Sequence, residues 1–317
     1  GGNGGRREIG TGKGMVKNMK RKVFAAVLAG VMALGLAACS QGGESRSSSP
    51  ADSSSSDAAS GAGETEEGEK LELTVFAAAS LTETLNEIST LYEKEEPDVK
   101  LIFNFDSSGT LKTQIQEGAD CDLFLSAGQT QMDQMDVSAD PSENTENLDL
   151  VLEGSRTDIL ENKVVLCAME DSKIPVESFD DMAEKLKEGT ILLGMGNSDV
   201  PVGQYTQKIL EYYGLDEKEL DERGLISYGS NVKEVTTQIS EGAVNCGVIY
   251  CTDAYSAGLT VTDEATEEMC GQVIYPAAVM KNSSHPEEAQ AFLDFLQTDA
   301  CMEIFEKVGF SRVEQGA

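Results

Sequence analysis

The 317-residue sequence has a single histidine, His285, which lies in a polar turn directly before Pro286. A metal site built from histidines is therefore excluded, as is a Ser-His-Asp triad that does not use His285. The G-x-x-x-x-G-K-[ST] pattern is absent, which excludes a P-loop ATPase. Acid–base or nucleophilic catalysis needs a base, and no histidine lies near the motifs described below, so we expect a protein that is not an enzyme.

Basic residues are scarce, with 24 Lys and Arg against 56 Asp and Glu and a formal net charge of -32. Residues 1–38 carry seven of the basic residues and one Glu, so the rest of the chain is more acidic still. Such a chain is not expected to bind nucleic acid or an anionic membrane through its surface field. The negative net charge would also repel an anion, so any anion site must depend on a local arrangement of hydrogen-bond donors or positive groups.

The seven cysteines include no C-x-x-C pair. Cys246 and Cys251 lie on one apolar run, and in an extended chain they would be roughly 16 Å apart, too far to bridge. Buried free thiols are the simplest interpretation. Disulfide pairing among four further cysteines is left open; these are Cys121, Cys167, Cys270 and Cys301.

The N-terminal region resembles a bacterial lipoprotein leader. Residues 1–18 begin with Gly and are set aside, and a basic segment then starts at Met19. The apolar run from Val23 to Ala38 is short for a membrane span, which needs about 20 residues. The run ends in Leu-Ala-Ala before Cys39, which is similar to a lipobox and implies lipidation of Cys39. An ordinary secretory cleavage or a retained anchor are the alternatives. We therefore assign residues 1–38 to the leader and signal peptide.

Residues 39–69 are rich in Ser, Gly, Ala and Glu and have almost no large apolar side chains. They cannot bury a core, so we expect a disordered tether after the lipidated Cys39. From Leu71 onward, strand-like runs alternate with segments of helical spacing, which indicates an α/β fold with mostly parallel sheets. The predicted strands are Leu71–Phe76, Val99–Phe105, Asp122–Ala127, Lys163–Met169, Ile191–Met195, Val244–Tyr250 and Gln272–Met280. Residues 286–305 read as one amphipathic helix, and residues 130–158 are uninformative.

Four predicted helices begin with short polar or proline-containing sequences that follow strands or turns. These are Ser80-Leu81-Thr82-Glu83, Ser107-Ser108-Gly109-Thr110, Val200-Pro201-Val202-Gly203 and Ser230-Asn231-Val232-Lys233-Glu234. Each start exposes unpaired backbone N–H groups and the positive end of the helix dipole, and any one alone is an ordinary capped helix. If the four starts converge, they form an anion site without Lys or Arg. Ligands of open α/β sheets bind outside the carboxyl ends of strands, which favours convergence.

These segments, taken in order, resemble those of the molybdate-binding proteins of molybdate ABC importers. The matching motifs are Val75-Phe76-Ala77-Ala78-Ala79-Ser80-Leu81, Phe105-Asp106-Ser107-Ser108-Gly109-Thr110-Leu111, Asp122-Leu123-Phe124-Leu125-Ser126-Ala127, Val200-Pro201-Val202-Gly203 and Gly247-Val248-Ile249-Tyr250. The resemblance covers residues 70–315. It implies a two-lobed type II periplasmic-binding-protein-like fold that closes at a hinge around a tetrahedral oxyanion. The implied lobes are residues 70–168 plus 270–317, and residues 169–269.

The resemblance also implies the ligand-binding residues. Ser80 and Ser108 would donate a hydroxyl and a backbone N–H, Val202 and Val232 would donate backbone N–H groups, and Tyr250 would donate its phenol O–H. Molybdate at neutral pH is a fully deprotonated dianion that needs only donors, whereas phosphate keeps a proton and would need an acceptor. Asp106, beside the serines, is a departure, because it would repel a dianion if it faced the ligand.

The resemblance therefore predicts a lipid-anchored solute-binding protein on the extracytoplasmic face of the cell membrane. We expect no cofactor and no metal other than the molybdate or tungstate ligand. The expected partner is the permease subunit of an ABC transporter, with no nucleic acid, and the chain is expected to be a monomer. Three alternatives remain: a binding protein for another oxyanion such as sulfate or phosphate, a structural or adhesive surface lipoprotein, and an enzyme.

Overall fold

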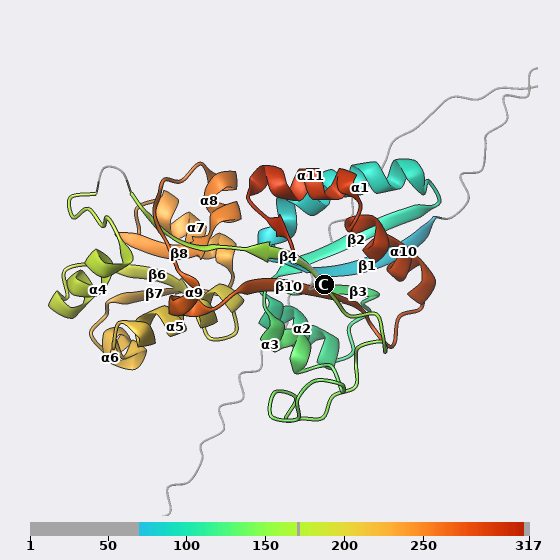
Figure 1. The fold of residues 1–317 in the computed structure, drawn as a ribbon, viewed down its shortest axis with the longest axis horizontal. Coiled ribbons are helices and arrows are strands. Elements are labelled where there is room, and N and C mark those ends of the chain that lie inside the picture. Colours follow the sequence, from blue (N-terminus) through green and yellow to red (C-terminus); the bar gives the residue numbers. More distant parts are fainter. Residues whose placement is uncertain (1–69, 170–171, 314–317) are drawn as a thin grey trace, which may run out of the picture. The chain divides into compact units, whose positions relative to one another are not determined.

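The computed structural model describes residues 70–169 and 172–313, which form two α/β lobes, each built on one sheet (Figure 1). The predicted signal peptide, Cys39 and the tether lie outside these residues. The first sheet has the order β11 (Ser311–Arg312), β4 (Thr157–Asn162), β10 (Val273–Val279), β3 (Leu123–Leu125), β1 (Leu71–Ala78), β2 (Val99–Asp106). The second has the order β7 (Ile226–Gly229), β6 (Leu193–Gly196), β8 (Cys246–Tyr250), β5 (Val164–Ala168), β9 (Val261–Glu264). The predicted two-lobed α/β fold is confirmed.

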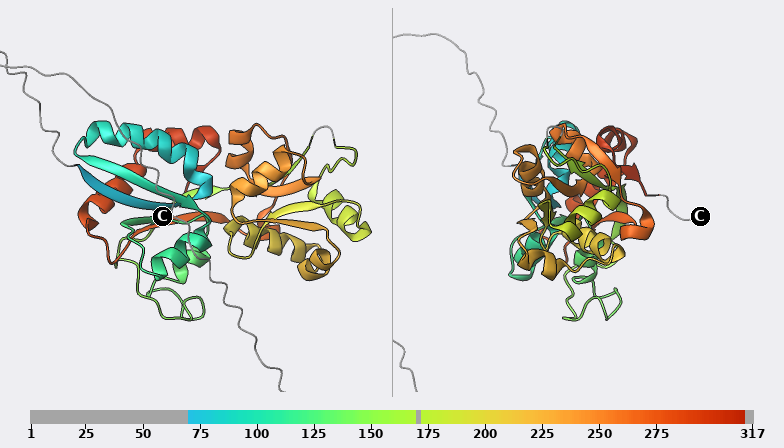
Figure 2. Two further views of the ribbon diagram at one scale, coloured as in Figure 1. Left: turned by 180° about the vertical axis from the view of Figure 1, so that it is seen from behind. Right: turned by 90° about the vertical axis from the view of Figure 1, so that its left-hand side faces the viewer.

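Helices cover both sheets. Those of the first lobe are the 3-10 turn η1 (Ala79–Leu81), α1 (Thr82–Glu95), α2 (Ser108–Gln116), α3 (Gln129–Asp133), α10 (Pro286–Leu296) and α11 (Asp299–Val308). Those of the second lobe are α4 (Phe179–Glu188), α5 (Pro201–Tyr212), α6 (Glu217–Glu222), α7 (Val232–Ser240), α8 (Cys251–Ala257) and α9 (Glu267–Cys270). In opposite views, α1 and α11 lie on one side of the first sheet and α2 and α3 on the other (Figures 1 and 2). None of the helices in the described part of the chain combines the length and apolarity that a membrane crossing requires.

Both sheets are mixed, although the sequence predicted mostly parallel ones. β1 pairs in parallel with β2 and β3, and β6 pairs in parallel with β7 and β8. β10 is antiparallel to β3 and β4, and β5 is antiparallel to β8 and β9. The antiparallel strands lie next to the points where the chain passes between the sheets. Parallel neighbours need a crossover connection, usually a helix, whereas antiparallel neighbours do not.

The first passage between the sheets lies at Lys163, the single residue between β4 and β5. The sequence placed the lobe limit after residue 168, but Val164–Ala168 pairs with β8 and so belongs to the second sheet. That strand is apolar throughout and gives no sign of which sheet it joins. The second passage runs from β9 to β10 and includes the predicted limit at residues 269 and 270.

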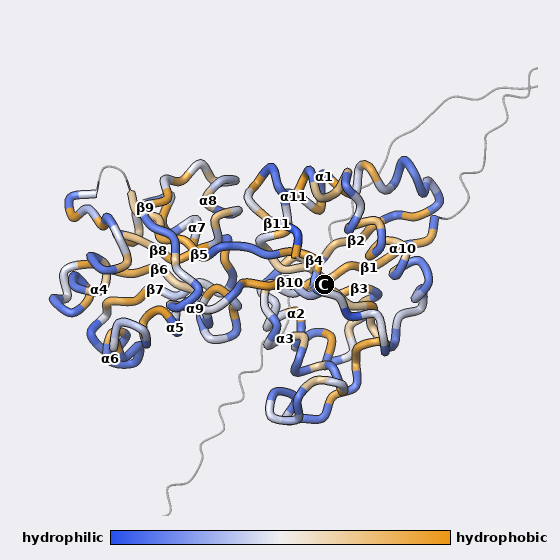
Figure 3. The backbone as a smooth tube through the Cα atoms, in the orientation of Figure 1, coloured by the Kyte–Doolittle hydropathy of each residue, from blue (hydrophilic) through white to orange (hydrophobic). Residues whose placement is uncertain are grey.

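The central strands β1, β3 and β8 are hydrophobic, as the colouring of the tube in Figure 3 shows, because helices cover both faces of each sheet. Leu73, Val75 and Ala77 of β1 are fully buried. Across the helical layer, the Tyr92 ring of α1 packs on Phe292 of α10, with centroids 4.8 Å apart. The predicted single helix over 286–305 is instead α10 and α11, because Thr298 adopts an extended conformation between them.

Candidate anion-binding site

Parallel pairing brings the ends of the strands together within each sheet. In the first lobe, Ala78 of β1 pairs with Asp106 of β2, and the residues after these strands include Ser80 and Ser108. In the second lobe, Gly196 of β6 pairs with Gly229 of β7, and the helices that follow contain Val202 and Val232. The candidate residues therefore follow the carboxyl ends of neighbouring strands in both lobes.

One small cavity gathers all five predicted site residues. Its wall consists of Ala78, Ala79, Ser80, Ser107, Ser108, Ala127, Val200, Pro201, Val202, Val232 and Tyr250. The empty volume is about 200 Å³. The wall comes from both lobes and includes no Lys, Arg, Asp or Glu among the described residues. The five residues are thus brought together as expected, while their role in binding stays a prediction.

Helix starts supply backbone donors to this cavity. Ser108 and Val232 are the first residues of α2 and α7, and Val202 is the second residue of α5, after Pro201. N–H groups in a first turn have no acceptor within their own helix, and the helix dipole places partial positive charge there. Such starts favour an anion between them.

The side-chain caps leave the first N–H groups unused. Ser107 Oγ accepts a hydrogen bond from the N–H of Thr110 at 3.2 Å, and Asn231 Oδ1 accepts one from the N–H of Glu234 at 3.1 Å. Both caps therefore engage the third residue of the helix. The cavity-lining Ser108 and Val232 keep their own N–H groups for a ligand.

Ser80 does not cap a helix, so the helix start predicted at Ser80 is wrong. A 3-10 turn, Ala79–Leu81, precedes α1, whose N-cap Leu81 makes no side-chain bond. The Ser80 hydroxyl instead lies 3.0 Å from Tyr275 Oη. Ser108 Oγ accepts the N–H of Ala127 at 3.0 Å, so its own proton remains available to the cavity.

Tyr250 ends β8 and is buried, with its phenol hydroxyl donating to the carbonyl of Ala127 at 3.4 Å. Burial raises the pKa of Tyr250 well above its ordinary value, and the neighbouring Tyr275 and Tyr205 add to the effect. The phenol therefore keeps its proton and is a donor at physiological pH. The bond to Ala127 is long, so a charged acceptor in the cavity would compete for this proton.

Asp106 does not line the cavity. One carboxylate oxygen, Oδ1, accepts the N–H of Ser107 at 2.8 Å and the amide of Asn231 at 3.3 Å. The Asn231 contact joins the first lobe to the second. Asp106 is thus held by donors beside the cavity and is part of the contact between the lobes.

Two further contacts join the lobes around the cavity, one from Gly109 to Asp199 and one from Lys233 to Glu83. The N–H of Gly109 donates to the carbonyl of Asp199 at 3.1 Å. Lys233 Nζ of α7 lies 2.7 Å from Glu83 of α1 and 3.0 Å from the buried Asp253 of α8. Together with the small cavity volume, these contacts describe the lobes in a closed arrangement. The ion pairs of Lys233 with Glu83 and Asp253 are not predicted from the sequence, because no sequence motif indicates them.

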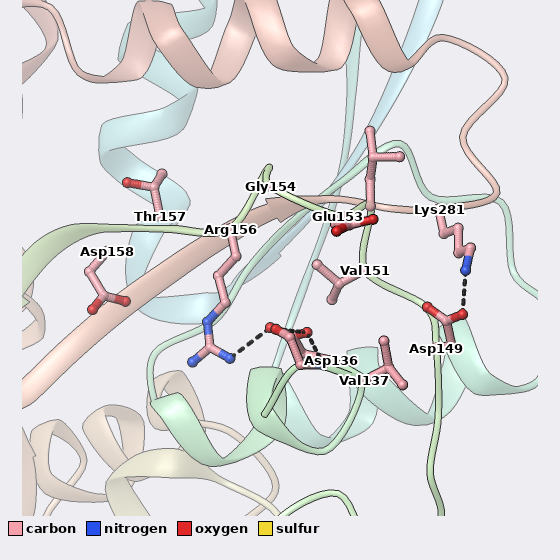
Figure 4. A pocket seen from close by; sticks show the side chains of 12 residues that line it. Asp136, Val137, Asp149, Val151, Glu153, Gly154, Arg156, Thr157, Asp158 and Lys281 are labelled. Atoms are coloured by element: carbon pink, nitrogen blue, oxygen red, sulfur yellow. Dashed lines mark hydrogen bonds and ion pairs between the residues drawn. The ribbon is translucent and has the colours of Figure 1, made fainter. Parts of the chain in front are cut away.

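A much larger groove in the first lobe is lined by several acidic side chains, unlike the cavity described above (Figure 4). Its empty volume is about 1340 Å³, and its wall carries the carboxylates of Asp136, Asp149, Glu153 and Asp158. Arg156 pairs with Asp136, and the ammonium of Lys281 pairs with Asp149. Both cations are therefore engaged, and the remaining carboxylates would repel an anion.

The remaining candidates for reactive or metal-binding groups in the described residues are the cysteines and the acidic side chains. Within residues 70–169 and 172–313, no group of three or more His, Cys, Asp or Glu is arranged to hold a metal ion. Six cysteines fall in this part of the chain, and all are free thiols. The sulfur atoms thus form no structural cross-link there, which agrees with the interpretation of Cys246 and Cys251 as unbridged thiols.

Known proteins are similar to this chain over most of its length. Residues 73–311 match the model of the family described as bacterial extracellular solute-binding protein. YvgL of Bacillus subtilis, named as an ABC transporter substrate-binding lipoprotein, is 34% identical over 78% of this chain and 89% of its own. The molybdate-binding protein ModA of Haemophilus influenzae is 29% identical over 75% of this chain and 89% of its own.

A solved structure supports the same relationship. It is the substrate-binding domain of a protein named as a molybdenum ABC transporter from Clostridium difficile. It is 30% identical, with a TM-score of 0.55, and the match covers 77% of this chain and all of that one. These relatives are solute-binding proteins rather than enzymes. The chain therefore belongs to the bacterial extracellular solute-binding protein family, as a solute-binding protein of ABC transporters.

Proposed function

We propose that this protein captures molybdate or tungstate between its lobes and delivers the ion to a membrane permease. The observation that carries the proposal is the cavity, whose wall offers donors from both lobes and, in the part of the chain that the structure describes, includes no charged side chain. An anion that only accepts hydrogen bonds fits such a wall. Hydrogen bonds to a charged acceptor are about twice as strong as neutral ones, so a dry ring of neutral donors can hold a dianion.

The number and type of donors match a tetrahedral oxyanion. Ser80, Ser108 and Tyr250 offer hydroxyl groups, and the starts of α2, α5 and α7 offer backbone N–H groups. An oxyanion that retains a proton would need an acceptor, and the wall has no carboxylate among the described residues. The proposal therefore favours molybdate and tungstate over phosphate. The molybdate-binding relatives support the same choice.

Calorimetric titration of the purified protein with molybdate, tungstate, sulfate and phosphate tests this proposal. We expect molybdate and tungstate to bind far more tightly than sulfate or phosphate. Sulfate is also fully deprotonated and is the rival oxyanion, so its titration is the decisive comparison. Equal or tighter sulfate binding would replace molybdate as the proposed ligand.

A proline substitution tests whether a backbone N–H holds the anion. Val232→Pro removes that donor at the first position of α7, where proline is favoured, and the preceding Asn231 is already extended, as a residue before proline prefers to be. We expect affinity for molybdate to fall roughly ten- to thirtyfold, because a hydrogen bond to a charged group contributes on the order of 1.5–2 kcal/mol.

The matched control is Val232→Ala, which keeps the N–H and should bind nearly normally. Circular dichroism should show both variants folded. If alanine weakens binding as much as proline, the side chain matters instead. Val202 is less suitable for this test, because Pro201 before it is already helical and a following proline would disfavour that conformation.

The anchor is a second part of the proposal, motivated by Leu36-Ala37-Ala38-Cys39 and by the lipoprotein relative. Lipidation of Cys39 would hold the protein on the extracytoplasmic face of the membrane, with stable anchoring if two or more acyl chains are attached. Cys39→Ala should move the protein from the membrane fraction to the soluble fraction of the cells. Unchanged fractionation would show that another feature anchors it.

A further inference from the structure

A line of buried polar side chains leads from the passage between the sheets to the cavity wall. Asn162 Nδ2 lies 3.0 Å from Tyr275 Oη and 3.0 Å from Thr252 Oγ1. Tyr275 Oη lies 3.0 Å from Ser80 Oγ. All four residues are buried, and Tyr275 stands behind Ser80, outside the wall of the cavity.

The orientation of the Asn162 amide is set by its neighbours. Asn162 Oδ1 accepts the N–H of Lys163 at 2.8 Å and the thiol of Cys251 at 3.2 Å. A backbone N–H can only donate, so the amide oxygen must face Lys163. Both amide protons then point to Thr252 and Tyr275, and Tyr275 Oη is an acceptor in this bond.

The phenol proton of Tyr275 is therefore not used toward Asn162, and the Ser80 hydroxyl, 3.0 Å from Tyr275 Oη, is an acceptor within its reach. Burial raises the pKa of Tyr275 well above its ordinary value, so the phenol remains protonated. When Ser80 Oγ accepts that proton, its own hydroxyl proton turns away from Tyr275. The cavity is where that proton can reach an acceptor, because Ser80 forms part of the wall.

We propose that Tyr275 is a positioning residue that makes Ser80 a hydrogen-bond donor to the bound oxyanion and so favours anions without a proton. This inference rests on the proposed function. A protonated anion needs an acceptor, and Tyr275 occupies one of the lone pairs with which Ser80 would accept. A site that leaves a ligand proton without a partner rejects that ligand, because an unpaired buried polar group is costly.

A double-mutant cycle in the full-length protein tests the inference, with molybdate as the probe in calorimetry. Tyr275→Phe keeps the buried ring, which packs edge-on against Phe310 with centroids 5.3 Å apart, so we expect the fold to hold. We expect each of Tyr275→Phe and Ser80→Ala to lower the affinity about three- to tenfold. The double variant should bind no more than about twofold more weakly than Ser80→Ala alone, because Tyr275 acts through Ser80.

Selectivity gives a second measurement. In Tyr275→Phe the Ser80 hydroxyl can rotate and accept, so the ratio of molybdate affinity to phosphate affinity should fall. A purely structural role would weaken both anions alike. Tyr205→Phe is the matched control, because its ring packs against Tyr250 with centroids 6.4 Å apart and its phenol makes no hydrogen bond to the described residues. It should bind as the unaltered protein does.

The outcomes separate the two proposals. Suppose that the unaltered protein binds molybdate. If the fold-losses in affinity of Tyr275→Phe and Ser80→Ala multiply in the double variant, or if Tyr275→Phe does not change the affinity, the positioning role is overturned and the proposed function stands. If the unaltered protein does not bind molybdate, the proposed function is overturned, and the positioning role with it.

Discussion

Replacing Gly109 with alanine is expected to lower the affinity for molybdate roughly ten- to a hundredfold while leaving both lobes folded. A Cβ atom at Gly109 would lie 2.2 Å from the carbonyl oxygen of Asp199, which belongs to the other lobe. Overpacking of this kind costs about 1–3 kcal/mol or more, and here the lobes would have to part to relieve it. Parting the lobes would also withdraw the donors of α5 and α7. Alanine itself favours a helix, so α2 should persist.

Small-angle scattering distinguishes this loss of closure from a local defect. We expect molybdate to reduce the radius of gyration of the unaltered protein and to leave that of the Gly109→Ala variant unchanged. Gly118→Ala is the matched control: Gly118 has a positive φ of 93° and no atom near its Cβ position. It should lose about 1 kcal/mol of stability and none of its affinity. Normal affinity in Gly109→Ala would mean that closure does not need this contact.

Asp253 is expected to make the free energy of unfolding depend on pH in the direction opposite to most carboxylates. Its side chain is fully buried, and burial raises its pKa from 3.8 to about 6, although the nearby Lys233 opposes the shift. Lys233 Nζ lies 3.0 Å from Asp253 Oδ1 and opposes the shift both through its charge and as a hydrogen-bond donor, but burial outweighs these effects. The folded protein therefore holds this proton more tightly than the unfolded chain does.

The sign follows from proton linkage. A raised folded pKa contributes stability that is fully present below about pH 4 and is lost as the pH rises through about 6. The full contribution is about 3 kcal/mol, since one pKa unit corresponds to about 1.4 kcal/mol. Asp253→Asn removes the titration, so we expect its free energy of unfolding, relative to the unaltered protein, to rise by about 2 kcal/mol between pH 4 and pH 7, because the unfolded carboxyl is already half ionised at pH 4.

Chemical denaturation at several pH values measures this difference, and titrations common to both proteins cancel. Asp136→Asn is a control of opposite sign. Although burial acts to raise it, the pKa of Asp136 is lowered by hydrogen bonds from Ser138 and by Arg156. That variant should therefore lose relative stability as the pH rises. A difference between Asp253→Asn and the unaltered protein that is constant with pH would contradict the expected burial effect.

Local sequence patterns predicted the helix starts around the cavity, and the resemblance to the molybdate-binding proteins singled out the five site residues, including Tyr250 at the end of β8. Ser108, Val202 and Val232 lie in local patterns of capping residues and proline that one stretch of chain displays. Tyr275 could not be found this way, because it lies within a strand and meets Ser80 across 195 positions of the chain. The same holds for Lys233 and Glu83, which are 150 positions apart. Contacts of this kind depend on how the lobes meet.

The limits of the fold prediction have similar causes. The strands β4, β7, β9 and β11 are not predicted from the sequence; β9, for example, has exposed ends, a half-buried middle and no hydrophobic run. Strand direction was predicted poorly, because it depends on where the chain returns after each passage between the sheets. The assignment of Val164–Ala168 failed for the same reason: an apolar strand fits either sheet equally well.

The wall of the cavity is shared by two lobes that are connected at Lys163 and again between β9 and β10. An ion held there would occupy the place that a buried side chain has in an ordinary protein interior, with half of its neighbours on each side. Releasing the ion then requires the lobes to separate, and separating the lobes breaks the hydrogen bonds that hold the ion. A membrane partner that binds both lobes and stabilises their open arrangement can therefore release the ion without contacting it.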